Sequence, residues 1–174
     1  MQDTIIVYFS LEGNVDFLAH KIAEKLNADI FRLETVKEYH KSGLLKFLHG
    51  GKDVTFGIKP ELKNTITDFS KYSHIILGTP IWAGKPSSPL NSFLDKIDFQ
   101  KKFVSVFTSC AGSSSDNCVS ILERMIVKRN GILCAKTSFV NPIKNESNAS
   151  YMIENFCKKI SEKIASTKGD IDKK

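Results

Sequence analysis

The sequence predicts an α/β protein with a doubly wound, five-stranded parallel sheet and helices on both faces. Two observations support this fold class. Short apolar runs, which are typical of strands covered on both faces, recur along the 174 residues. Stretches with apolar residues every three or four positions separate these runs. This alternation implies parallel strands that are joined by right-handed crossovers.

Five apolar runs are the candidate strands. They are TIIVYF at 4–9, ADIFRL at 28–33, HIILGT at 74–79, FVSVFT at 103–108 and ILCAKTSFV at 132–140. Four apolar stripes mark the predicted helices: Leu18, Ile22 and Leu26; Leu90, Phe93, Leu94 and Ile97; Val119, Leu122, Met125 and Ile126; and Ile153, Phe156, Cys157, Ile160 and Ile164. We therefore expect one domain over residues 1–166 and a frayed tail over 167–174.

The segment 39–57 is longer than a simple crossover requires. Its apolar residues at 44–48 predict a short amphipathic turn, which Gly50 and Gly51 end. We expect this segment to cover an edge of the sheet, and the alternative is that it borders the ligand.

Composition argues against several functional classes. The net charge is +6, but the lysines are scattered and form no arginine-rich block, so nucleic-acid binding is not expected. No apolar stretch approaches the roughly 20 residues that span a bilayer, and the polar start MQDT is unlike a signal peptide. We expect a cytoplasmic protein that makes no membrane contact. Its four cysteines lack the spacing of a zinc site and are expected to be free thiols: Cys110, Cys118, Cys134 and Cys157.

The loop after the first predicted strand is a candidate phosphate site. The first amides of a helix lack intrahelical partners, and the helix dipole is positive there. Gly13 permits close backbone approach, and Ser10 and Asn14 can donate from their side chains. A carboxylate about 4 Å from a phosphate costs about 4 kcal/mol at an effective dielectric near 20, so Glu12 is expected to face solvent. The alternative is a plain strand-to-helix turn that Asn14 caps.

Two more loops are expected at the same edge of the sheet, because ligands bind at the carboxyl ends of parallel strands. In the segment 78–97, Thr79 and Pro80 are expected to end the strand, and Gly84 and Pro86 to shape an exposed turn. Trp82 either covers a flat heteroaromatic ring or packs under this turn.

The small polar residues of 108–117 suit close backbone approach to a ligand. Cys110 in this loop is expected to be a packing residue. A redox role would need a lowered thiol pKa.

These three loops resemble the flavin loops of flavodoxins. Residues 10–15 resemble the FMN phosphate loop, roughly Ser/Thr-x-Thr-Gly-Asn-Thr, except that Glu12 and Val15 replace hydroxyl residues. PIWAGKP is similar to the segment along the isoalloxazine ring, and TSCAGS to the second flavin loop. The resemblance implies strand order 2-1-3-4-5 and FMN as cofactor. The implied FMN-binding residues are Ser10, Leu11, Glu12, Gly13, Asn14, Val15, Thr79, Pro80, Ile81, Trp82, Ala83, Gly84, Ser109, Cys110, Ala111 and Gly112.

Three functions are consistent with these observations. The first is an electron-transferring protein in which a non-covalent flavin works with a redox partner protein. The second is an NAD(P)H-dependent quinone or flavin reductase on the same fold, which the basic charge and the long segment 39–57 favour. The third is a cofactor-free scaffold or regulatory module, which Glu12 and Val15 keep open. No catalytic residue or metal ligand is predicted, and either a monomer or a homodimer is compatible with the sequence.

Overall fold

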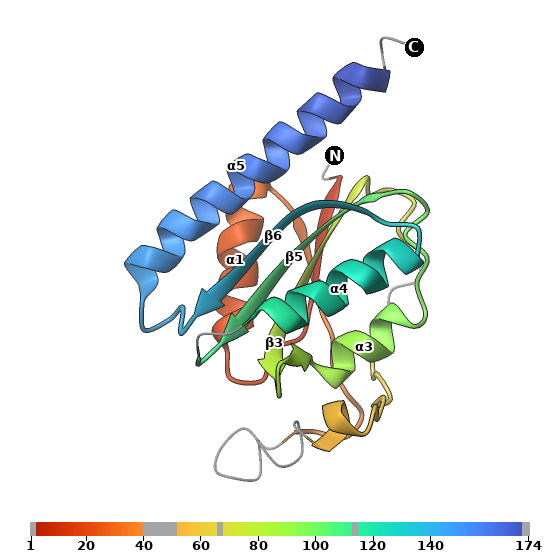
Figure 1. The fold of residues 1–174 in the computed structure, drawn as a ribbon, viewed down its shortest axis with the longest axis vertical. Helices are drawn as coiled ribbons and strands as arrows, with labels where there is room; N and C mark the ends of the chain where they lie inside the picture. The colour runs from red at the N-terminus through yellow and green to blue at the C-terminus, as the bar shows by residue number, and fades with distance from the viewer. Residues whose placement is uncertain (1–2, 40–51, 66–67, 113–114, 172–174) are drawn as a thin grey trace.

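The computed structural model describes residues 3–39, 52–65, 68–112 and 115–171, and shows a parallel sheet between helices (Figure 1). Its strands and helices follow one another along the chain as β1 (Thr4–Tyr8), α1 (Asn14–Leu26), β2 (Asp29–Arg32), β3 (His74–Trp82), β4 (Lys85–Pro86), α3 (Ser88–Leu94), β5 (Phe103–Cys110), α4 (Asp116–Lys128), β6 (Ile132–Val140) and α5 (Glu146–Ile171). The sheet order is β2-β1-β3-β5-β6, with β4 paired to β3 at the side of this path. The five parallel strands therefore have the predicted order 2-1-3-4-5.

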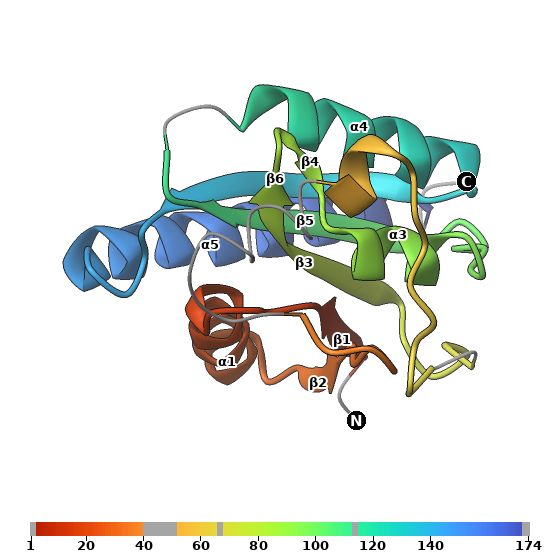
Figure 2. The ribbon, with the colours of Figure 1, turned by 90° about the horizontal axis from the view of Figure 1, so that it is seen from below.

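Alternation along β1 explains why helices cover both faces of the sheet. Ile5 and Val7 belong to a buried cluster with residues of α3 and α4, whereas Ile6 and Tyr8 belong to a cluster with residues of α1 and α5. Successive side chains of a strand point to opposite faces, so an unbroken apolar run supplies two cores. Figure 2 shows the two layers of helices on either side of the sheet.

The third strand continues past its predicted end. Thr79 and Pro80 are aligned with Thr108 and Ser109 of β5, and β3 runs on to Trp82. The prediction that the Thr-Pro pair ends the strand was wrong. Alignment with β5 persists through the proline, so its missing N–H does not end the strand.

Helix boundaries differ modestly from the predicted ones. Helix α3 ends at Leu94, and Ile97 lies beyond it, partly buried against the same core. Helix α5 continues past residue 166 to Ile171 and packs on β6 and α1. The amphipathic turn expected at 44–48 lies outside the described residues. In the part of the chain that the structure describes, no helix has the length and apolar character needed to cross a membrane.

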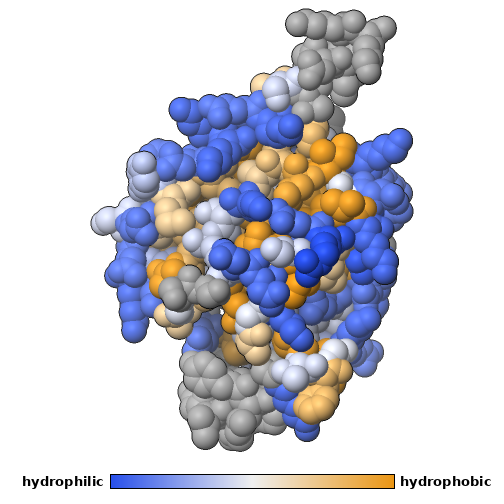
Figure 3. All heavy atoms as spheres, viewed as in Figure 1, coloured by the Kyte–Doolittle hydropathy of each residue, from blue (hydrophilic) through white to orange (hydrophobic). Residues whose placement is uncertain are grey.

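Strand β6 forms one edge of the sheet. On the face that carries β6 and α4, hydrophobic side chains reach the surface among hydrophilic ones (Figure 3). Val127, near the end of α4, and Ile132, at the start of β6, are both exposed. This face is therefore open to solvent.

Candidate functional site

The structure brings the three predicted loops to one edge of the sheet. The backbone N–H of Phe9 donates to the carbonyl of Gly78 at 3.1 Å, which holds the first loop beside β3. Pro80 is aligned with Ser109, which places the second and third loops side by side. The loops thus follow the carboxyl ends of β1, β3 and β5, the central strands of the sheet.

The first loop leads directly into α1. The helix begins at Asn14, and Gly13 precedes it with φ of 91°, a conformation that favours glycine. Gly13 occupies the N-cap position, so Asn14 is the first residue of the helix rather than its cap. The buried Ser10 hydroxyl instead accepts the amide of Asp16 at 3.1 Å.

Glu12 and Val15, which depart from the flavodoxin pattern, differ in their exposure to solvent. Glu12 is exposed, as expected, and so is directed away from the core. Val15 is 1% exposed and packs in the core with α1 and α5, so its side chain contributes to folding and only its amide faces the loop region. Within the described residues, a Cβ added at Gly13 would have no atom within 4 Å. The outer side of this loop is open to a ligand.

A cluster of charged and polar side chains that was not predicted from the sequence braces this loop. The Tyr8 hydroxyl donates to Asp16 Oδ1 at 2.7 Å. The guanidinium of Arg32 donates to the same oxygen at 3.3 Å and to the carbonyl of Ser10 at 3.1 Å. Burial, together with the hydrogen bond to Asp16, raises the pKa of Tyr8 well above its usual range, which keeps the phenol protonated. The sequence did contain a signal for this cluster. Asp16 lies just after the first predicted strand and Arg32 lies near the end of the second, so parallel pairing of these strands would bring the two side chains to the same edge of the sheet.

The second loop is a β-hairpin. Its turn residues, Ala83 and Gly84, have φ of 46° and 74°, as a two-residue type I′ turn requires. Trp82 pairs with Lys85 across the hairpin in antiparallel fashion. The turn at Gly84 was predicted from the sequence, but Pro86, which was expected to help shape an exposed turn, is buried in the strand β4 that follows it.

A buried pair of hydroxyls closes the base of this hairpin. The hydroxyl of Thr79 accepts the amide of Ser87 at 3.0 Å and donates to the Ser87 hydroxyl at 2.9 Å. Both residues have no exposed surface. Because these bonds join the two ends of the hairpin, they fix the place from which Trp82 projects.

Trp82 packs in part beneath the hairpin. Its ring lies 4.9 Å from that of Tyr39 and 5.6 Å from that of Phe9, measured between centroids. The Tyr39 hydroxyl donates to Asp53 Oδ2 at 2.7 Å. Trp82 remains partly exposed, so one part of its side chain packs inward and another is open to a ligand. Tyr39 and Asp53 belong to the segment 39–57, whose described ends therefore support the hairpin.

In the third loop, Ser109 is buried, whereas Ala111 and Gly112 are exposed. The Cys110 thiol donates to the Gly112 carbonyl at 2.8 Å. Burial raises the pKa of this thiol, which favours the packing interpretation over a reactive thiolate. At the start of α4, the Asn117 side chain donates to the carbonyl of Gly84 at 2.9 Å and so links this region to the hairpin.

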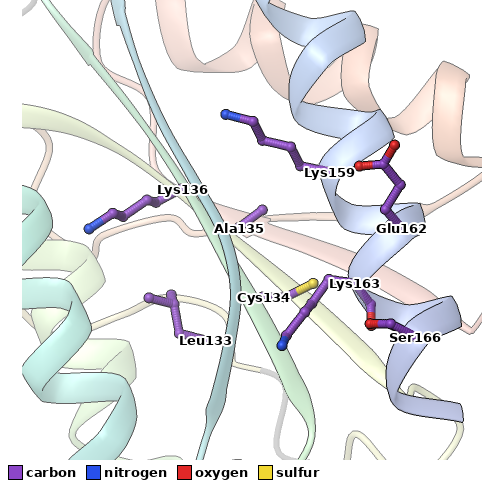
Figure 4. A pocket seen from close by; sticks show the side chains of 8 residues that line it. All are labelled: Leu133, Cys134, Ala135, Lys136, Lys159, Glu162, Lys163 and Ser166. Carbon is purple, nitrogen blue, oxygen red and sulfur yellow. The ribbon is translucent and has the colours of Figure 1, made fainter. Parts of the chain in front are cut away.

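Cavities lie both beside and away from the loops. One of about 260 Å³ adjoins the first loop and is lined in part by Ser10, Leu11 and Arg32. Another, of about 600 Å³, lies between β6 and α5 and is lined by none of the predicted site residues (Figure 4). Across the described ranges, no group of three or more His, Cys, Asp or Glu side chains is placed to hold a metal ion.

Comparison with known proteins agrees with this architecture. A family model described as Flavodoxin matches residues 3–156. A flavoprotein from Lactobacillus acidophilus NCFM, solved in complex with FMN, has a TM-score of 0.68 and 20% sequence identity, with 84% of this chain and 99% of that chain covered.

Two further solved structures share the fold. Oxidised Flavodoxin 2 from Bacillus cereus has a TM-score of 0.60 and 22% identity, with 92% of this chain and 99% of that chain covered. A WrbA-like flavodoxin from Agrobacterium tumefaciens has a TM-score of 0.54 and 18% identity, with 94% and 99% covered.

Proposed function

The chain belongs to the flavodoxin family, and we propose that it binds FMN and transfers electrons through this non-covalent flavin. The observation that carries the proposal is the convergence of three loops at the carboxyl ends of the central strands β1, β3 and β5. The first of these loops leads directly into α1, and the other two expose small or aromatic residues.

The residues present fit a phosphorylated flavin. The first loop offers helix-start amides and the Ser10 hydroxyl, with open space outside Gly13. Exposed Ala83, Ala111 and Gly112 allow a ring to approach the backbone of the other two loops. Glu12 is exposed to solvent, which screens its charge at this helix start.

When bound, FMN would supply the redox chemistry. The chain's own residues would hold the phosphate at the start of α1 and position the ring between the hairpin 79–86 and the loop 109–112. The Thr79–Ser87 hydroxyl pair would keep the hairpin in place. This role requires no acid–base residue, and the electrons would come from a redox partner protein in the cytoplasm.

A direct test begins with the colour of the purified protein. We expect two flavin absorption bands, and we expect the extracted cofactor to be FMN rather than FAD. A protein that stays colourless after incubation with FMN and desalting would contradict the proposal and favour the cofactor-free alternative.

A matched pair of glycine variants tests the site itself. Gly13 and Gly57 both have positive φ, and an added Cβ would meet no described atom within 4 Å at either position. Gly13→Val and Gly57→Val should therefore strain the backbone alike, whereas only Gly13→Val places bulk over the phosphate seat. We expect its FMN affinity to fall at least about tenfold, or 1.4 kcal/mol. Equal affinities in the two variants would contradict this site.

The net charge of +6 favours a second candidate, the NAD(P)H-dependent reductase, because cationic surfaces attract phosphorylated cofactors. Anaerobic mixing of the FMN-loaded protein with NADPH or NADH separates the two functions. Rapid bleaching of the flavin bands would support the reductase. No bleaching with either nucleotide would support a carrier that a partner protein reduces.

A further inference from the structure

We propose that Arg32 is the residue that makes the phosphate loop of this chain compatible with a dianionic phosphate, by offsetting the charge of Asp16 in the first turn of α1. The inference deepens the proposed function and rests on it. It assigns Arg32 the part of a positioning residue, one that acts on the cofactor through another side chain and through the loop backbone.

Two acidic residues lie close to the proposed phosphate site. Glu12 lies in the loop, and Asp16 lies in the first turn of the helix whose amides would hold the phosphate. Glu12 is exposed to solvent, which screens its charge. The Asp16 side chain is only 32% exposed, so its charge is screened less. Left alone, this carboxylate would repel an anion that is bound at the same helix end.

The groups around Asp16 offset its charge. Arg32 NH1 donates to Oδ1 at 3.3 Å, and the Tyr8 hydroxyl donates to the same oxygen at 2.7 Å. The ring of His20 lies 3.7 Å from Oδ2, and this side chain is well exposed. Tyr8 is neutral, and His20 is charged only when protonated, so Arg32 supplies the permanent positive charge among these neighbours.

Arg32 also acts on the loop backbone. Its NH2 donates to the carbonyl of Ser10 at 3.1 Å, so one guanidinium joins the end of β2 to both ends of the loop. A carbonyl held in this way is directed at Arg32. Ser10 in turn accepts the amide of Asp16 through its hydroxyl. The guanidinium of Arg32 therefore both offsets the charge of Asp16 and helps to fix the conformation of the loop.

The test compares FMN with riboflavin, which lacks the phosphate, as ligands of the apoprotein. We expect Arg32→Met to weaken FMN binding about tenfold at low salt, which corresponds to about 1.4 kcal/mol. Riboflavin affinity should be unchanged, and the FMN effect should shrink at high salt. Asp16→Asn should strengthen FMN binding, and the double variant should return close to the wild-type affinity.

A matched control removes a charge at the other end of β2. Lys71 pairs with Asp29 at 3.0 Å, and Lys71→Met should leave both ligand affinities unchanged. Thermal unfolding of each apoprotein reports any purely structural effect. If Arg32→Met proves unstable, Asp16→Asn alone carries the test, through a gain in FMN affinity without a gain in riboflavin affinity.

The outcomes separate the two claims. A wild-type protein that binds neither FMN nor riboflavin would overturn the proposed function and this inference with it. A wild-type protein that binds FMN, with Arg32→Met binding it equally well, would overturn only the inference. Parallel losses of FMN and riboflavin, without rescue by Asp16→Asn, would assign Arg32 a structural role instead and also overturn it.

Discussion

The hydroxyl pair at the base of the hairpin yields a sharp prediction. Thr79→Val keeps the shape of the side chain but removes its oxygen. The buried amide of Ser87 then loses its acceptor, and the Ser87 hydroxyl loses its donor. An unpartnered buried donor costs about 1–3 kcal/mol of folding free energy. In a domain of this size, each kcal/mol lowers Tm by about 2–4 °C.

Ser87→Ala is the matched control, because it orphans no buried group. The amide of residue 87 still donates to Thr79, whose hydroxyl lies 3.0 Å from the carbonyl of Pro80 and can donate there instead. We expect a loss of only about 0.5–1 kcal/mol, the ordinary net value of one hydrogen bond. Thr79→Val is therefore expected to lower the folding stability more than Ser87→Ala.

Urea and thermal unfolding of the apoproteins measure both changes without a contribution from ligand binding. FMN titration of the same variants reports the position of the hairpin, and Thr79→Val should weaken binding more than Ser87→Ala. The reasoning would be refuted if Thr79→Val had wild-type stability, or if Ser87→Ala cost as much as Thr79→Val.

Three further predictions concern the core and the ring site. Gly78→Ala would place a Cβ 2.8 Å from the Cβ of Tyr8 and against the ring of Phe107. We expect urea unfolding to show a loss of about 1–3 kcal/mol in folding free energy, and unchanged stability would refute this close packing. Burial lowers the pKa of His74 from 6.5 to about 4, so the unfolded state binds the proton more tightly. About 3 kcal/mol of stability should be lost as pH falls from 6.5 to 4, and a His74→Asn variant that keeps this part of the slope would refute the assignment. Trp82→Leu should weaken FMN binding by about 0.5–1.5 kcal/mol in a fluorescence titration, whereas an unchanged affinity would exclude stacking on this side chain.

The sequence was sufficient to predict the sheet, for a simple physical reason. Strands buried on both faces need apolar residues at most positions, and the runs at 4–9 and 103–108 are of this kind. Loops at the carboxyl ends of parallel strands then meet because the topology brings them together. The fold and the meeting of these three loops at one edge of the sheet therefore both follow from patterns that are local in sequence.

What the sequence could not predict depends on contacts between distant side chains. The apparent stop at Thr79 and Pro80 is overridden by alignment with β5, and the hairpin beyond it is closed by Ser87. The bond from Arg32 to the carbonyl of Ser10 joins residues whose approach no local pattern encodes. Trp82 was ambiguous because its environment includes Tyr39, which lies on a separate segment.

The strand order also has a consequence for how the chain folds during synthesis. β1 lies inside the sheet, between β2 and β3, and its Thr4 is aligned with His74. In a nascent chain, β1 can therefore pair only with β2 until β3 has been synthesised. β3 in turn lacks its second neighbour until β5 has been synthesised. Such non-local pairing gives a high contact order, which slows folding and leaves apolar strands transiently exposed. Translation rate and chaperone access should therefore influence the yield of this protein more than its length suggests.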